Sequence, residues 1–242
     1  DSIVPILPAE IDFLKEAALG DGLFPGDLKT NYNANPGSAL LTGATGFLGA
    51  FLLKDLLSQT KMHITCLVRP RNGESAFERI KKNLQHYSIW EDRFRDRISP
   101  LVGDLTQPQL GLSDQQWQKL AREIDVIYHN GAWLNFALSY SALKPANVLG
   151  TLEILKLAGE KKIKQLHYVS MMGIIAQPTV DPTQILPKVD GVDYSDIFDA
   201  DYIRTKGFNL GYFQSKWVAD ELVSKASERG LPTCIYRPTH IS

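Results

Sequence analysis

The sequence predicts an α/β protein built on a doubly wound parallel β-sheet. From residue 38 onward, short apolar runs bounded by turns alternate with longer segments of helical period. Strands that alternate with helices form parallel βαβ units. A run such as 64–68, which is apolar almost throughout, suits a strand that is covered on both faces. Together these observations predict a Rossmann-type sheet.

Six strands and five helices are expected in alternation. Each strand is a short apolar run closed by a turn, and each helix repeats its apolar side chains every three to four residues. The strands are expected at 39–41, 63–68, 98–102, 124–128, 163–169 and 233–236. The helices are expected at about 48–58, 74–87, 113–122, 145–160 and 212–229.

Two segments differ in composition from this regular pattern. Residues 1–37 form a polar lead-in rich in Pro, Gly and Asn, with one short helical pattern over 11–18, and we interpret it as a linker that packs on the domain. The domain itself is expected to span 38–242. Within it, the stretch 177–211 is rich in Pro, Asp and Gly and is too long for an ordinary connection, so we expect an insertion on the substrate side.

The composition describes a soluble globular protein. The chain has 242 residues, of which 44% are hydrophobic and 22% charged. A chain of this length can bury a full core without disulfides or a structural metal, and no metal site is predicted. The 26 basic side chains nearly cancel the 27 acidic ones, and no block of five like charges occurs. Bulk electrostatics therefore favour neither a nucleic acid nor an anionic membrane as a partner.

The sequence favours a reducing, cytoplasmic environment. Its two cysteines, Cys66 and Cys234, lie in apolar β-type runs, where a free thiol behaves as a small buried hydrophobic group. No apolar stretch approaches the roughly 18 residues of a spanning helix. Residues 1–10 also lack a basic region followed by an apolar one. We therefore expect a cytoplasmic protein without a membrane span.

A glycine-rich loop, TGATGFLG at 42–49, follows the first strand and opens the first helix. Gly43 lets the chain turn sharply, Gly46 lets backbone N–H groups approach a pyrophosphate, and Gly49 lets the helix and the strand pack closely. The positive end of the helix faces the phosphates. The alternative is a glycine-rich turn without a ligand. We predict a dinucleotide site formed by Gly43, Thr45, Gly46, Phe47, Leu48 and Gly49.

The residue after the second strand indicates which dinucleotide binds. NAD sites usually place an Asp or Glu about 20 residues beyond the loop, where it binds the ribose 2′-hydroxyl. Here Arg69 stands in that region, and its guanidinium would bind a 2′-phosphate instead, with Arg79 closing over the same group. We predict NADPH as the cofactor. The alternative is that both are solvated surface arginines.

Two further turns follow strands at the carboxyl edge, where such sheets bind ligands. Asp104 and Leu105 follow the third strand, and Asn130, Gly131 and Ala132 follow the fourth. These five residues are added to the predicted cofactor site. Asp104 is expected to accept a hydrogen bond from an adenine amine.

A tyrosine four residues before a lysine on one helix face would supply the proton for carbonyl chemistry. The lysine charge favours the phenolate and can also hold ribose hydroxyls. The chain has three such pairs, Tyr140/Lys144, Tyr202/Lys206 and Tyr212/Lys216.

The position of each pair along the chain indicates which of the three is catalytic. Tyr140 precedes the fifth strand, and Tyr202 is soon followed by two glycines that weaken a helix. Tyr212 starts an uninterrupted helical pattern that leads into the sixth strand, so Tyr212 and Lys216 are predicted to be catalytic. The alternative is one buried tyrosine and one exposed lysine without a chemical role.

These motifs together resemble the extended short-chain dehydrogenase/reductase superfamily. They are TGATGFLG, the arginine after the second strand, GDL at 103–105, HNGAWLN at 129–135, NVLGT at 147–151 and YFQSK at 212–216. Within the superfamily, LVRP at 67–70 with an arginine-bearing helix and ALGDGLFPGD at 18–27 are most similar to thioester reductase domains. Such domains terminate nonribosomal peptide and polyketide assembly lines and carboxylic acid reductases.

The resemblance implies an NADPH-dependent reductase domain within a larger multidomain synthetase. Its partner would be an acyl or peptidyl carrier protein whose phosphopantetheine arm holds the substrate as a thioester. Hydride addition to the thioester carbonyl would give a thiohemiacetal that collapses to an aldehyde, and a second reduction to the alcohol is left open. The resemblance adds Asn135 to the cofactor site and implies that Tyr212 and Lys216 also contact the cofactor.

Two features depart from the family pattern. The family places a Ser or Thr that helps hold the carbonyl oxygen in the segment HYVSMMG, and by register that position holds Met171. Ser170 takes this catalytic role only if the backbone bends at the strand end, because neighbouring strand residues point to opposite faces. Chains of this kind also continue past the sixth strand, so a truncated substrate-binding subdomain is expected.

Two other functions stay open from the sequence. A nucleotide-sugar epimerase or dehydratase of the same superfamily would share the loop and the Tyr–Lys pair but would favour NAD, and Arg69 argues against it. A redox-silent domain that binds a carrier protein without reducing its thioester is kept open by Met171.

Overall fold

The computed structural model describes residues 11–24, 35–71, 73–174, 211–239 and 241. Its centre is a six-stranded parallel sheet of strand order β3-β2-β1-β4-β5-β6. The strands are β1 (Ser38–Thr42), β2 (His63–Val68), β3 (Ile98–Val102), β4 (Val126–His129), β5 (Gln165–Val169) and β6 (Thr233–Tyr236). The chain reverses its winding direction between β1 and β4, which is the doubly wound arrangement. The predicted Rossmann-type fold is therefore confirmed.

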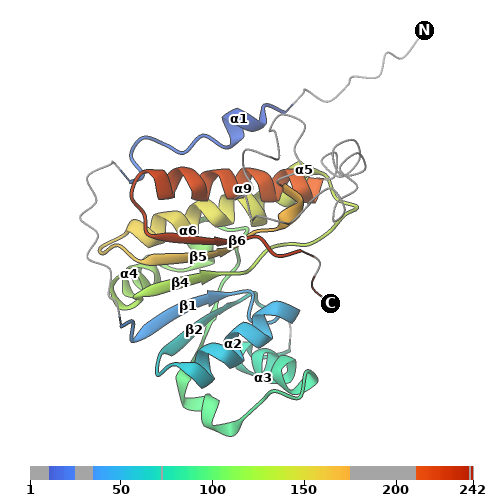
Figure 1. Cartoon of the computed structure of the whole chain (residues 1–242). Helices are drawn as coiled ribbons and strands as arrows, with labels where there is room; N and C mark the ends of the chain where they lie inside the picture. The colour runs from blue at the N-terminus through green and yellow to red at the C-terminus, as the bar shows by residue number, and fades with distance from the viewer. Residues whose placement is uncertain (1–10, 25–34, 72, 175–210, 240, 242) are drawn as a thin grey trace, which may run out of the picture.

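Helices cover both faces of the sheet (Figure 1). On one face lie α2 (Phe47–Gln59) and α3 (Ala76–His86), and on the other lie α4 (Asp114–Glu123), α6 (Gly150–Gly159) and α9 (Gly211–Glu228). The short helix α1 (Phe13–Glu16) packs outside α9, and α5 (Tyr140–Lys144) lies beside the first turn of α9. The shorter described elements are 3₁₀ turns at Asp92–Arg97 and Met172–Ile174, a turn at Pro108–Gly111 in which Gln109 and Leu110 have positive φ, and a π-helical turn at Pro145–Leu149.

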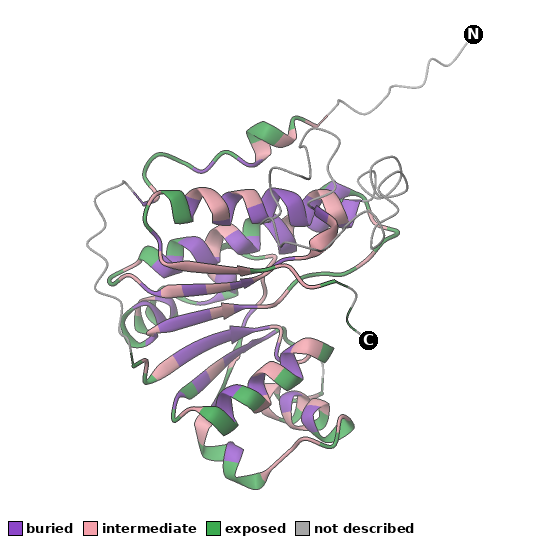
Figure 2. Cartoon of the chain, viewed as in Figure 1, coloured by how far each residue is buried: buried purple, intermediate pink, exposed green. Residues whose placement is uncertain are grey.

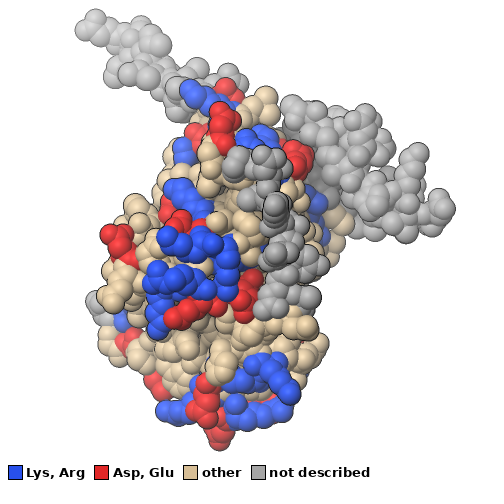
Figure 3. All heavy atoms as spheres, turned by 90° about the vertical axis from the view of Figure 1, so that its left-hand side faces the viewer, with Lys and Arg blue, Asp and Glu red and all other residues tan. Residues whose placement is uncertain are grey.

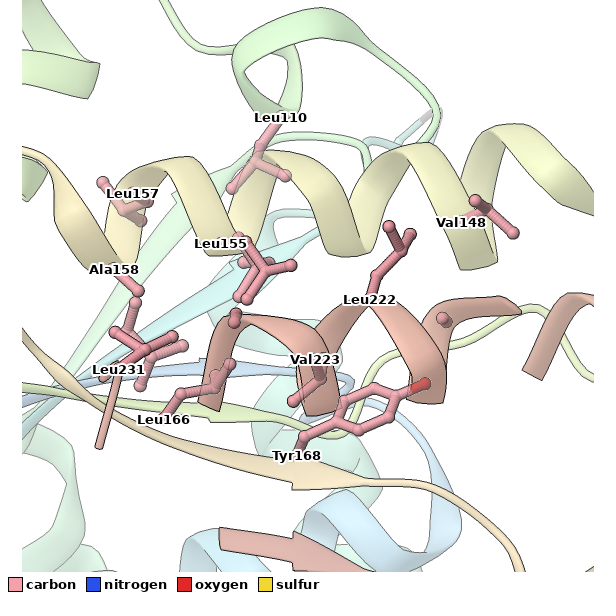
Figure 4. Packing of buried hydrophobic residues seen from close by; sticks show 14 of the residues in the cluster. Leu110, Val148, Leu155, Leu157, Ala158, Leu166, Tyr168, Leu222, Val223 and Leu231 are labelled. Carbon is pink, nitrogen blue, oxygen red and sulfur yellow. The ribbon is translucent and has the colours of Figure 1, made fainter. Parts of the chain in front are cut away.

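The hydrophobic core has two parts, one on each face of the sheet. Leu155 of α6, Leu222 and Val223 of α9 and Tyr168 of β5 pack together in the larger part (Figure 4). The smaller part joins α2 and α3 to β1 and β2. Figure 2 shows that the central strands are buried along much of their length, as expected for strands covered on both faces.

The helix predicted at 145–160 begins earlier than the sequence indicates and changes its winding. It starts as α5 at Tyr140, passes through one π-helical turn at Pro145–Leu149 and continues as α6. Pro145 has no N–H to continue the α-helical ladder, and the Gly150 N–H donates to the Pro145 carbonyl instead. The strands predicted at 124–128 and 163–169 each begin two residues later in the structure, at Val126 and Gln165.

The described part of the lead-in packs closely on the domain. Ala17, Leu19 and Phe24 are buried in the larger core. The predicted insertion at 177–211 lies outside the described residues, apart from Gly211, which begins α9. Among the helices that are described, none combines the length and the apolar character needed to cross a bilayer.

The amino-terminal edge of the sheet carries mixed charge. Figure 3 shows Lys and Arg side chains beside Asp and Glu on this face. Lys162, just before β5, lies 2.7 Å from Asp125, just before β4. The loops that contain the predicted site residues lie at the opposite, carboxyl edge.

Candidate active site

The glycine-rich loop forms a tight turn between β1 and α2. Gly43 has a φ of +77°, and a Cβ there would lie 2.8 Å from Asn130 Nδ2. At Gly49 a Cβ would lie 1.9 Å from the Gly43 carbonyl oxygen, so α2 packs directly against the turn. Gly46 is the exposed N-cap residue of α2 and supplies no side chain to bind the first N–H groups of the helix. The loop is thus shaped to accept an anionic group at the helix N-terminus.

Asn83 of α3 holds this loop in place. Its Nδ2 donates to the carbonyl oxygens of Ala44, at 3.1 Å, and Gly46, at 3.0 Å. Sequence reasoning missed Asn83, because an asparagine within a helix carries no pattern that reveals a partner 39 and 37 residues away. The other predicted loop residues, Thr45, Phe47 and Leu48, are half-buried or exposed at the loop surface.

The side chain of Arg79 reaches the backbone of Arg69, the other arginine that the sequence predicts to bind phosphate. Arg69 follows β2 and is exposed, and Arg79 lies on α3. The Arg79 Nη1 donates to the Arg69 carbonyl oxygen, which places the Arg79 guanidinium at the end of β2. The contact joins the Arg79 side chain to the Arg69 backbone, and the binding of a 2′-phosphate by the two guanidinium groups stays a prediction.

The turn after β3 is ordered by its own hydrogen bonds. Asp104 Oδ1 accepts a hydrogen bond from the Thr106 N–H at 2.9 Å, and the Asp104 N–H donates to the Leu110 carbonyl at 2.7 Å. Leu105 lies against α6, because a Cβ at Gly150 would be 2.7 Å from the Leu105 carbonyl oxygen. Both predicted residues are half-buried at the carboxyl edge, and Leu105 also lies near the turn after β4, because a Cβ at Gly131 would be 3.0 Å from Leu105 Cδ1.

The turn after β4 packs against the glycine-rich loop. The Gly131 N–H donates to Thr42 Oγ1 at 2.8 Å, and Asn130 Nδ2 lies 3.5 Å from the Gly43 carbonyl oxygen. Ala132 is exposed. Asn135 Oδ1 accepts a hydrogen bond from the Ala137 N–H at 2.9 Å, so this side chain shapes its own loop.

A buried hydrogen-bond chain links the two loops to α6. His129 Nδ1 lies 2.8 Å from Thr42 Oγ1, and His129 Nε2 lies 3.0 Å from Thr151 Oγ1. Burial, and secondarily the charge of Lys216, lowers the pKa of His129 to about 3, so the ring is neutral. Thr151 donates its own hydroxyl proton to the Asn147 carbonyl, which leaves Nε2 of His129 as the donor to Thr151. His129 therefore locks the carboxyl ends of β1 and β4 in one arrangement.

The predicted catalytic tyrosine and lysine lie one turn apart at the start of α9. Both are buried, at 8% and 3% exposure. Lys216 Nζ donates to Tyr168 Oη and to the Val169 carbonyl, each at 2.8 Å. The rings of Tyr212 and of Phe136, from the loop after β4, meet edge to face with their centroids 5.4 Å apart. The helix thus places both side chains at the carboxyl end of β5.

Ser170 is buried directly after β5. It is 5% exposed, and its Oγ has no hydrogen-bond partner among the described residues. A buried hydroxyl without a partner costs free energy, so its presence points to a ligand that it binds. Met171 is half-buried and packs against Gly173 in the following 3₁₀ turn. The backbone keeps pairing alongside β6 past Val169, because the Ser170 N–H donates to the Tyr236 carbonyl at 2.7 Å and the Met172 N–H donates to the Pro238 carbonyl at 2.9 Å, and it turns only from Met172 onward. The catalytic role of Ser170 stays a prediction.

The electrostatics of Tyr212 differ from the expected effect of the lysine. The sequence predicted that Lys216 lowers the tyrosine pKa, but burial raises the pKa of Tyr212. Burial also lowers the pKa of Lys216 to about 8, and the Asp220 carboxylate acts in the opposite direction. Burial is the cause of the shift at Tyr212, and Lys216 Nζ donates to Tyr168 and Val169.

The two buried lysines predict how stability depends on pH. Burial lowers the pKa of Lys164 and of Lys216 to about 8, well below their unfolded value near 10.5. Between about pH 8 and 9 the unfolded chain keeps protons that the folded chain has released, so the free energy of unfolding should rise with pH. Above this window the raised pKa of Cys66, about 12, acts in the opposite direction, because the unfolded thiol loses its proton first.

Urea unfolding across this range would measure the effect. The rise should shrink in Lys164→Met and again in the double variant with Lys216→Met. An unchanged slope in the double variant would show that neither lysine causes it.

The residues at the carboxyl edge fit a nicotinamide dinucleotide. The glycine turn leaves space that a Cβ would fill, the first turn of α2 faces that space, and Ser170 Oγ is buried without a partner among the described residues. A doubly wound sheet with such a loop after β1 and a buried Tyr–Lys pair beyond β5 defines an NAD(P)-binding oxidoreductase domain.

The chain belongs to the NAD-binding family described as "Male sterility protein", whose family model matches residues 41–242. It is 48% identical over 200 residues to a linear gramicidin synthase from Brevibacillus parabrevis, covering 83% of this chain and 4% of that protein. It is 35% identical over 221 residues to the large subunit of the L-2-aminoadipate reductase from Penicillium chrysogenum, covering 90% of this chain and 16% of that protein.

A solved structure extends this similarity. The terminal R domain from the myxalamid PKS-NRPS biosynthetic pathway superposes with a TM-score of 0.78 and 42% identity, over 95% of this chain and 55% of that chain. The resemblance to thioester reductase domains that the sequence predicted is confirmed. The chain spans little more than half of the solved domain and a small part of each curated relative.

Proposed function

We propose that this chain is the NADPH-dependent part of a reductase domain that releases an acyl or peptidyl chain as an aldehyde. The substrate is the thioester on the phosphopantetheine arm of a carrier protein. One observation carries the proposal. Buried Lys216 is bound to the carbonyl of Val169, the residue before Ser170, whose hydroxyl has no partner within the described part of the chain, and Tyr212 lies one turn earlier on the same helix.

These side chains provide the acid for carbonyl reduction. When bound, the nicotinamide supplies a hydride to the thioester carbonyl carbon. Tyr212, whose raised pKa keeps it protonated, donates its proton to the carbonyl oxygen, while Ser170 Oγ donates a hydrogen bond to the same oxygen. The ammonium of Lys216 would stabilise the phenolate that is left behind and would hold the ribose hydroxyls of the bound cofactor. As the C–S bond of the resulting thiohemiacetal breaks, its hydroxyl loses a proton to become the aldehyde carbonyl, and the departing sulfur takes up a proton to become the thiol.

The carrier protein as partner rests on the relatives. The chain is similar to 4% of a linear gramicidin synthase and to a terminal R domain of a PKS-NRPS pathway. A reductase domain at such a position receives its substrate from a carrier domain. The similarity to an L-2-aminoadipate reductase favours reduction over a redox-silent role.

Single-turnover oxidation of NADPH tests the proposal. The full-length protein is mixed with NADPH and a carrier protein loaded with an acyl thioester, and absorbance at the nicotinamide band is followed. We expect one NADPH to be consumed for each aldehyde trapped, or two where the alcohol forms. Binding of the carrier without NADPH oxidation would contradict the proposal and favour the redox-silent alternative.

Arg69 is expected to select NADPH over NADH. Loss of a desolvated arginine–phosphate contact typically costs about 2 to 5 kcal/mol, but Arg69 is exposed, so we expect the lower end of that range. In Arg69→Ala the affinity for NADPH should fall at least tenfold, whereas the affinity for NADH should hold. Titration of both nucleotides into both proteins measures this difference, with Arg71→Ala as the matched control. Equal affinities of the unmodified protein for the two nucleotides would overturn the assignment.

A further inference from the structure

The Tyr140/Lys144 pair, which has the same spacing as the predicted catalytic pair, binds a residue of the lead-in. Tyr140 Oη donates to Glu16 Oε2 at 2.8 Å. Lys144 Nζ lies 2.8 Å from Glu16 Oε1 and 2.6 Å from Glu16 Oε2. The ring edge of Phe13 packs on the Tyr140 ring, with the centroids 5.1 Å apart. One carboxylate of α1 thus holds both ends of α5.

Glu16 is held in its charged form. Burial raises the pKa of its carboxyl, but the hydrogen bonds from Lys144 and Tyr140 outweigh this and hold the pKa below its usual range. The Glu16 and Lys144 side chains are 25% and 33% exposed, so water screens the pair only in part. The tyrosine hydroxyl adds a charge-assisted hydrogen bond to the same carboxylate.

The start of α5 is in direct backbone contact with the start of α9. A Cβ at Gly211 would lie 2.2 Å from the Tyr140 nitrogen and 2.5 Å from the Leu138 carbonyl oxygen. Gly211 immediately precedes Tyr212, and Phe136 of the same loop packs on the Tyr212 ring. A displacement at Tyr140 is therefore transmitted to the turn that carries Tyr212.

A second anchor of the lead-in lies far from this turn. Arg229 donates to the carbonyl oxygens of Leu19, Gly20 and Leu23 at 2.7 to 2.9 Å, just beyond the last residue of α9. Since α9 has 18 residues, this anchor is about 25 Å from Tyr212 along the helix. Between the two, Lys225 Nζ donates to the Ala17 carbonyl at 2.8 Å. The described lead-in is thus fixed along α9, and its contacts through Glu16 and Phe13 are the ones at the end that carries Tyr212.

We propose that Glu16 is a positioning residue. Through Tyr140 and Lys144 it fixes the first turn of α9 and with it the hydroxyl of Tyr212. The proposal rests on the proposed function of Tyr212. It makes the described lead-in a part of the frame of the active site rather than a passive linker.

Hydrogen exchange and kinetics test this role together. Three variants of the full chain are compared: Glu16→Ala, Tyr140→Phe and, as the matched control, Arg229→Met. The amides of 215–218, which bond to carbonyls of the first turn of α9, should exchange about tenfold faster in Glu16→Ala and Tyr140→Phe. In the full-length protein kcat should fall about tenfold in the same two variants, with the affinity for NADPH unchanged. Arg229→Met should speed exchange only over 19–24 and leave kcat as it is.

Two results would refute the positioning role of Glu16. If Arg229→Met lowers kcat as much as Glu16→Ala, or if Glu16→Ala changes neither exchange at 215–218 nor kcat, Glu16 has no positioning role. Tyr140→Phe removes a single oxygen atom and carries the test if Glu16→Ala fails to fold. Exchange that follows the prediction in a protein without any reductase activity would refute the proposed function but leave the mechanical link between Glu16 and α9 standing.

Discussion

Replacement of Tyr212 by phenylalanine should abolish reduction while the affinity for NADPH changes little. The lost hydroxyl acts on the oxyanion that develops on the substrate, and a positioned general acid contributes about 10²- to 10⁴-fold to the rate. The ring itself would stay in place, because it is buried and packs against Phe136. Single-turnover NADPH oxidation and a nucleotide titration on the same preparation measure the two effects.

Lys216→Ala should impair both reduction and NADPH binding. Its ammonium is proposed to serve Tyr212 and the cofactor ribose, and its removal also leaves Tyr168 Oη and the Val169 carbonyl without this donor. Tyr212 is expected to act only in the transition state of the reduction, whereas Lys216 is expected to act both in the NADPH complex and in the transition state. The comparison of the two variants separates these two roles.

The other two tyrosines of the same spacing are the controls for Tyr212. Tyr140→Phe should lower the rate only about tenfold, because Tyr140 contacts Glu16 and not the reacting atoms. Tyr202 lies outside the described residues, and Tyr202→Phe should keep full activity. If either variant proved inactive while Tyr212→Phe reduced its substrate, the choice among the three pairs would be wrong.

The positions of the strands along the chain and the position of the glycine loop follow from local sequence patterns. An apolar run closed by a turn is a local signal, and the predicted bounds of β2, β3 and β6 agree with the structure. The same holds for the glycine loop, since a turn of this type needs a positive φ at Gly43 and no Cβ at Gly49. A glycine in the sequence therefore indicates directly where the backbone needs a positive φ or a close approach.

Contacts between distant segments were not predictable in the same way. Asn83 supports the phosphate loop from 39 and 37 residues away, and Glu16 binds Tyr140 across 124 residues. Neither side chain belongs to a motif, so only the folded arrangement reveals its partner. The spacing of Tyr212 and Lys216 predicted that both lie on one face of a helix, but it did not predict that their side chains are buried away from water. Burial reversed the expected shift of the Tyr212 pKa.

Gly49→Ala should cost both stability and dinucleotide binding. The new Cβ would lie 1.9 Å from the Gly43 carbonyl oxygen and 2.7 Å from the Gly43 carbonyl carbon, and both are backbone atoms that cannot move without α2 or the turn. Overpacking of this kind typically costs about 1 to 3 kcal/mol. Because the turn and the helix N-terminus together form the phosphate site, the affinity for NADPH should fall by at least about a hundredfold.

Two other glycines provide matched controls for Gly49→Ala. At Gly46 the nearest atom to a new Cβ is the Gly43 carbonyl oxygen at 3.4 Å, and the φ of −96° suits alanine, so Gly46→Ala should keep the stability of the unmodified protein. It should still weaken NADPH binding, since a methyl group there would stand in the path of the pyrophosphate. Gly20 has nothing within 4 Å of a new Cβ, and Gly20→Ala should change neither property. Urea unfolding and NADPH titration of all three variants give the comparison. A Gly49→Ala protein with the stability and affinity of the unmodified chain would show that α2 does not need its close approach to the turn to form the cofactor site.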